Sequence, residues 1–158
     1  MNEFQIVQNH GIAAISLYHF IKEYYAAKDK IEGPSLSYLM PVLPIVFNEE
    51  SNKRLSQNQK RTSSFYKSLA DERAIPVGLQ SRMEDMYKDT LEAIDICFYK
   101  NIIEYSSESS QFYPKSRIEV PDLVYDDNKT IIASSKLLGF WFAKLSIEEI
   151  CISLNINF

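Results

Sequence analysis

The side chains in this sequence that could bind a metal include two histidines. His10 and His19 lie nine residues apart, the first at a predicted helix start and the second on the polar face of that helix. A zinc site takes three or four nitrogen, sulfur or oxygen ligands that converge on one point. No third ligand is evident beside either histidine in the sequence. We therefore expect no metal site there.

Carboxylates form the second candidate for chemistry. Asp85, Asp89 and Glu92 recur at spacings of three and four on the outer face of a predicted helix, where they could hold a metal or serve in acid–base work. A catalytic carboxyl group needs a pKa shifted by burial or by a neighbouring charge. The pattern places no apolar residues around these three. It therefore predicts a solvated acidic face.

The two cysteines, Cys97 and Cys151, lie within apolar helical patterns and lack metal-ligand spacing. Of the two interpretations, a disulfide or two buried free thiols, the sequence favours free thiols. A phosphate-binding glycine loop and a nucleophile with an evident base are also missing from the sequence. With only four glycines and two histidines, the chain is not expected to be an enzyme and should need no cofactor and no small-molecule substrate. A catalytic group assembled in space would require a polar pocket that sequence cannot reveal.

Length and composition indicate one folded domain spanning residues 1–158. The net charge of -4 and the pI near 5.2 oppose autonomous binding to nucleic acid, because phosphates would be repelled. Aromatic residues reach 13 %, which suits a packed core and contact surfaces for partners. The N-terminus lacks a signal-peptide pattern, and the apolar run at 36–47 is too short to span a bilayer. We expect a cytoplasmic protein that does not enter a membrane.

The most apolar run of the chain, residues 33–47, contains Pro34, Pro41 and Pro44. Because prolines inside a helix remove donors and cause clashes, this run predicts a short, kinked and buried helix. Helical periodicity predicts longer helices packed around it. These are expected over residues 11–28, from Pro76 to about 98, over 131–145 and over 147–154, with a short one after Thr62 or Ser63. Residues 48–61 are expected to be an exposed connection, and 114–129 an irregular crossing.

After the long central helix the side-chain pattern changes from helical spacing to short β-prone runs, which predicts a β-hairpin. Residues 102–105 and 111–113 are β-prone and bracket a serine-rich loop at 106–110. A helix followed at once by a small hairpin is the outline of a winged helix. The fold class is therefore mainly α with one small β-hairpin (α+β), a helical domain with a winged-helix-like hairpin. Because the preceding helix is acidic, a hairpin used for protein contact fits better than one laid on DNA.

Two surfaces are candidates for binding a partner protein. Phe140 falls on the polar side of its helix, between Lys136 and Lys144, where a large ring could anchor a partner. The alternative is that lysine stems or a neighbouring loop partly cover the ring. The second surface is the hairpin, with three rings: Tyr105, Phe112 and Tyr113.

Basic residues after the apolar run offer a different function. They are Lys53, Arg54, Lys60 and Arg61. One interpretation is a loop that contacts phosphates, which would make the chain a winged-helix DNA-binding regulator. The other is a solvated linker, which we favour because no aromatic or glycine-rich pattern accompanies the charges.

Several segments together resemble the middle component of bacterial three-component ABC systems. The first is Asn9 before an alanine-rich aromatic helix, followed by GP (33–34) and LMPVLPIVF (39–47). The others are RTSSFYKSL (61–69), NIIEYS (101–106) and KLLGFWFAKLSIEEICISLNI (136–156). The hairpin loop departs from the family pattern with serines in place of a glycine turn, and Asn155 stands where a glycine cap is usual. The positions that carry the resemblance are expected to determine the fold: Gly33, Pro34, Pro44, Gly139, Trp141 and Phe142.

This family includes the small accessory subunit of Lamassu-type defence complexes. The resemblance implies a non-catalytic adaptor that binds an SMC/Rad50-like ABC ATPase and links it to an effector, often a nuclease, in anti-phage or anti-plasmid defence. DNA would then be met only through the complex. No catalytic residues are implied by the resemblance.

Overall fold

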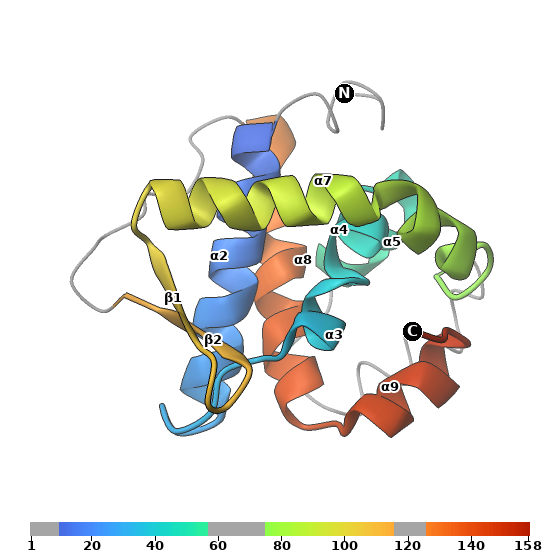
Figure 1. The fold of residues 1–158 in the computed structure, drawn as a ribbon. Helices are drawn as coiled ribbons and strands as arrows, with labels where there is room; N and C mark the ends of the chain where they lie inside the picture. Colours follow the sequence, from blue (N-terminus) through green and yellow to red (C-terminus); the bar gives the residue numbers. More distant parts are fainter. Residues whose placement is uncertain (1–9, 57–74, 116–125) are drawn as a thin grey trace.

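The computed structural model describes residues 10–56, 75–115 and 126–158, and these form a mainly α fold with one two-stranded hairpin (Figure 1). This confirms the predicted mainly α fold with one small β-hairpin. The elements, in chain order, are α2 (His10–Ala27), α3 (Leu36–Leu39), α4 (Val42–Val46), α5 (Glu49–Ser56), α7 (Leu79–Tyr99), β1 (Ile103–Ser106), β2 (Gln111–Pro114), α8 (Asp126–Ala143) and α9 (Ile147–Leu154).

Helices α2 and α8 lie side by side along the centre of the fold (Figure 1). The close approach depends on Gly139, because a Cβ there would stand 2.5 Å from the carbonyl oxygen of Phe20. Ser135, one turn earlier, is fully buried. The ring of Phe142 then meets that of Phe20 edge to face, with centroids 5.6 Å apart. Small residues at 135 and 139 thus leave room for α2 to lie close to α8.

The proline-rich run forms two short helices, α3 and α4, separated at Met40 and Pro41. The predicted interruption is confirmed, and every residue from Val42 to Phe47 is buried. Pro44 fits within α4 because a proline in the first turn of a helix removes a donor that would have no intrahelical partner. Helix α7 crosses α2 and packs against α4, so that α4 lies beneath the longest helix (Figure 1).

Two predicted irregular segments are partly helical, which corrects the sequence interpretation. Helix α5 forms over Glu49–Ser56 because Asn48 Oδ1 accepts a hydrogen bond from Ser51 N at 3.0 Å, the arrangement of an N-cap. Its Leu55 is 1 % exposed, so this helix is anchored in the core. Helix α8 starts at Asp126, inside the expected crossing. Polar contacts join the two helices, since Ser134 Oγ donates to Asn52 Oδ1 at 2.6 Å.

Helix α2 is buried on more sides than its sequence predicts. His19, expected on the polar face, is 3 % exposed, and Ser16 on the same helix is 0 % exposed. The Ser16 hydroxyl donates to the carbonyl of Ile12 at 2.8 Å, and the His19 ring meets Tyr18 edge to face at 5.3 Å. Helix α7 on one side and α8 on another enclose α2, so its polar residues turn inward with partners from their own helix.

The predicted hairpin is confirmed, with Ile103 opposite Pro114 and Ser106 opposite Gln111. It is fixed to the chain before α3. Phe112 N donates to the carbonyl of Pro34 at 2.9 Å, and Gly33 N donates to Gln111 Oε1 at 3.1 Å. This contact requires glycine, because a Cβ at position 33 would stand only 1.8 Å from the Phe112 carbonyl oxygen.

The C-terminal helix α9 forms as predicted. Ser146 and Glu149 make a reciprocal capping box, and Asn155 ends the helix in the left-handed conformation with φ 53°. Cys97 and Cys151 are free thiols, the first buried and the second half-buried. Asn9 and the predicted short helix after Thr62 or Ser63 lie outside the described residues.

Candidate functional site

An apolar stripe runs along α7 beside its buried face. Tyr87, Leu91 and Phe98 lie one turn and then two turns apart, so they share one side of the helix. Their exposed fractions are 45 %, 40 % and 40 %. Large apolar side chains that remain this exposed in a row are typical of protein contact surfaces.

The stripe continues onto the hairpin through a chain of aromatic rings. The Phe98 ring lies 6.1 Å from that of Phe112, which in turn lies 4.8 Å from that of Tyr105. Tyr105 is 48 % exposed, whereas Phe112 is only 6 % exposed. Phe112 therefore belongs to the core and supports its neighbours from below, so its predicted role as a direct partner contact is corrected. We call Tyr87, Leu91, Phe98 and Tyr105 the α7–hairpin surface.

Acidic side chains border the α7–hairpin surface. Glu84 and Asp95 are exposed on the same helix, next to the apolar stripe. One cation also lies there, because Lys88 Nζ stands 5.9 Å from the centre of the Tyr87 ring. The surface is therefore apolar at its centre and mainly negative at one edge. A partner that matches it would carry an apolar groove and a basic rim.

The third predicted ring of the hairpin, Tyr113, points inward. Its ring meets that of Tyr25 on α2 edge to face at 5.7 Å, and its hydroxyl donates to Gln111 Oε1 at 2.7 Å. The half-buried Tyr113 therefore fixes the hairpin to α2 and presents only part of its surface to a partner.

Phe140 lies near the C-terminal end of α8, half-buried against the core. Lys144 Nζ stands 5.4 Å from the centre of its ring, and Lys136 is also half-buried. The ammonium group of Lys144 therefore lies over this ring, in keeping with the alternative that a lysine partly covers it. Lys144 also reaches the carbonyl of Ala27 at 3.5 Å, which places this surface at the end of α2 where the hairpin packs.

The predicted phosphate contact of the basic residues stays a prediction. Lys53 is exposed on α5, and Arg54 belongs to the same helix. The side chain of Arg54 lies outside the described part of the structure, as do residues Lys60 and Arg61.

The helical periodicity of α7 leaves Cys97 and Phe98 as alternatives for its buried face and does not single out Tyr87 or Leu91. In the structure Cys97 is buried and Phe98 is exposed. One signal in the sequence could have revealed this surface, namely that α7 has more apolar residues than a single buried face needs. A helix with one buried face needs about three such positions in every two turns, and α7 carries a second row beside them.

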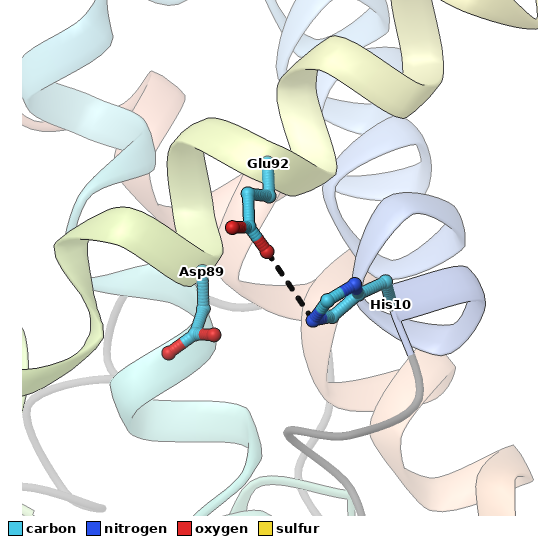
Figure 2. Close-up of side chains that lie close together, drawn as sticks. All are labelled: His10, Asp89 and Glu92. Atoms are coloured by element: carbon cyan, nitrogen blue, oxygen red, sulfur yellow. Dashed lines mark ion pairs between the residues drawn. The ribbon is translucent and has the colours of Figure 1, made fainter.

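A cluster of charged groups lies on the opposite flank of α7. His10, in the first turn of α2, faces Asp89 and Glu92 (Figure 2). Its Nε2 stands 3.3 Å from Glu92 Oε2, and one ligand atom of each of the three residues lies within 4.8 Å of the others. The sequence does not show this proximity, because His10 lies far from the two carboxylates along the chain. Glu92 is exposed, as predicted for the acidic face, whereas Asp89 is half-buried.

Asp89 is the least exposed member of this cluster. Partial burial raises the pKa of its carboxyl group above the ordinary value, and the nearby charge of Glu92 raises it further, while His10 opposes the shift. The protein therefore holds two carboxylates together at a position where a positive charge would be favoured.

A family model described as ABC-three component (ABC-3C) system Middle Component 3 matches residues 1–158. The chain belongs to the middle component 3 family. This confirms the resemblance drawn from the sequence, and membership in a three-component system implies partner subunits. Comparison with curated proteins and with solved structures finds no match.

The positions that carried the resemblance to middle components act in packing. Gly33 and Gly139 allow the two close backbone approaches, and Trp141 and Phe142 are fully buried. Within residues 10–56, 75–115 and 126–158 of this middle component, no helix is both long and apolar enough to cross a bilayer.

Proposed function

We propose that this middle component is a non-catalytic adaptor that joins an SMC/Rad50-like ABC ATPase to an effector subunit, such as a nuclease, in Lamassu-type anti-phage or anti-plasmid defence. The observation that carries the proposal is the exposed α7–hairpin surface in a chain whose family works with other subunits. DNA would be sensed by the ATPase, and this chain would hold or release the effector.

The composition of the surface supports binding to a protein. Aromatic side chains are enriched at the centres of protein interfaces, because they bury a large area and lose little conformational freedom. Three of the four residues in the α7–hairpin surface are aromatic, and the buried Phe112 contacts two of these rings, Phe98 and Tyr105. The acidic edge adds electrostatic selection for a partner with a basic rim.

An adaptor needs a second surface, and we assign this to Phe140 with Lys136 and Lys144. The Phe140 ring and the two lysines offer an apolar patch with positive charge, opposite in sign to the edge of the α7–hairpin surface. Two surfaces of opposite charge would let the two partners be distinguished. Because Phe140 also contacts the core, its contribution should be tested with Lys136→Glu and Lys144→Glu as well as with a change of the ring.

Reconstitution of the three subunits tests the adaptor role. The ATPase and effector should co-purify when this middle component is present and separate when it is omitted. A stable ATPase–effector complex without the chain would contradict the proposal. Turnover of a substrate by the purified chain alone, abolished by one polar substitution, would contradict its non-catalytic role.

A further inference from the structure

We propose that His10, Asp89 and Glu92 form a binding site for a divalent transition-metal ion, with Zn²⁺ as the ion that the ligand set fits best. The site is separate from the α7–hairpin surface and does not depend on the adaptor role. It would connect the first turn of α2 to the middle of α7 (Figure 2).

The geometry gathers three ligands from two elements. Asp89 and Glu92 lie three residues apart on α7 and therefore point to one side of that helix. His10 reaches the same place from α2, and its ring faces the space between the two carboxylates (Figure 2). The three ligand atoms lie within 4.8 Å of one another. Zinc bonds of about 2.0–2.2 Å to nitrogen and oxygen require ligand atoms roughly 3.3 Å apart, so small side-chain rotations suffice.

Those rotations are open to these side chains. The side chains of His10 and Glu92 are 46 % and 56 % exposed, so neither is locked by packing. The pair formed by His10 Nε2 and Glu92 Oε2 already has the spacing of two ligands on one ion, at 3.3 Å. Asp89 alone must turn its carboxylate toward that pair (Figure 2).

The donor set selects the class of metal. An imidazole nitrogen is a good ligand for Zn²⁺ and a poor one for Mg²⁺ or Ca²⁺, which prefer oxygen. Two carboxylates neutralise the charge of the ion, and three protein ligands leave at least one position for water or for a side chain of a partner subunit. A metal here would therefore strengthen the contact between α2 and α7 and offer an attachment point on the surface.

Calorimetric titration of the full chain with Zn²⁺ tests the site. The protein should carry no histidine tag and should carry Cys151→Ser, since this half-buried thiol is a competing zinc ligand. We expect one saturable site in this background. Glu92→Gln and Asp89→Asn should each weaken it by at least about tenfold, because each removes a ligand. Glu84→Gln is the matched control, as it removes an exposed carboxylate from the same helix, and it should bind as the background does.

Cobalt provides a second readout that does not depend on stability. Co²⁺ at the site should give visible absorption bands of a low-coordinate nitrogen–oxygen site, and Zn²⁺ should displace it. Loss of the bands in Glu92→Gln and their retention in Glu84→Gln would support the proposal. Absence of saturable Zn²⁺ binding, or equal binding by Glu92→Gln and Glu84→Gln, would overturn it.

Discussion

Gly139 on α8 and Phe20 on α2 approach so closely that a Cβ at position 139 would stand 2.5 Å from the Phe20 carbonyl oxygen. This oxygen belongs to the helix backbone and cannot rotate aside as a flexible side chain can. The contact therefore sets the distance between the two central helices. The hairpin and α7, which pack on α2, take their positions from this pair.

Replacing Gly139 with alanine should destabilise the protein by about 1–3 kcal/mol, because the helices must separate to admit one methyl group. The sign of this change in stability shows whether the steric contact exists. Without the steric contact, alanine would stabilise a helix interior by about 1 kcal/mol relative to glycine. Chemical denaturation followed by circular dichroism measures the difference, and a more stable Gly139→Ala protein would contradict the close approach.

Gly33→Ala should displace the hairpin while leaving the helices intact. A Cβ at this position would stand 1.8 Å from the Phe112 carbonyl oxygen, so the hydrogen bond from Phe112 N to Pro34 must break or shift. Hydrogen exchange should show faster exchange at Phe112 N, with little change at the amides of α8. Unchanged protection of Phe112 N would show that the hairpin is not held by this contact.

Ser110 occupies the left-handed region with φ 55° in the hairpin loop, where glycine is less strained. Ser110→Gly should therefore stabilise the protein slightly, by up to about 1 kcal/mol. Ser107→Gly in the same loop is the control, since Ser107 does not have a positive φ, and it should be neutral or destabilising. Equal effects of the two changes on the unfolding midpoint would contradict this assignment.

The raised pKa of Asp89 predicts a pH dependence of stability. A carboxyl group whose pKa is raised in the folded state does not lower the stability of the fold below pH 3.8, its ordinary pKa, where it is protonated. It lowers stability by its full amount once the pH exceeds the raised pKa. In the presence of a chelator, Asp89→Asn should raise the thermal midpoint at pH 7, and this gain should vanish toward pH 3. Asp85→Asn, an exposed change on the same helix, is the control. A midpoint lowered by Asp89→Asn at pH 7 would contradict the raised pKa.

Much of the fold follows from local sequence signals. The prolines of the 33–47 run predict its division into α3 and α4, and the box of Ser146 and Glu149 predicts the start of α9. The small residues at 135 and 139 favour the close approach of another helix, which in the structure is α2. These signals are local, because each depends on residues within one or two helical turns.

The parts that sequence does not predict depend on contacts between distant residues. Helix α5 looks polar in sequence, yet Leu55 and the hydrogen bond between Ser134 and Asn52 fix it against α8. The cluster of His10 with Glu92 joins residues more than eighty positions apart. The exposure of Phe98 likewise depends on where the hairpin folds back, because its ring packs beside Phe112 and not beneath it.

The affinity of the α7–hairpin surface for a partner subunit tests the central proposal most directly. Leu91→Asp combined with Phe98→Asp should keep the fold, since both side chains are 40 % exposed, and should weaken the complex with one partner at least a hundredfold. Ile152→Asp on α9 is the matched control, because it removes an apolar side chain that is 82 % exposed. Binding measured by surface plasmon resonance should fall for the double variant and stay at the wild-type level for Ile152→Asp. Wild-type affinity of a folded double variant for both partners would contradict the assignment of this surface.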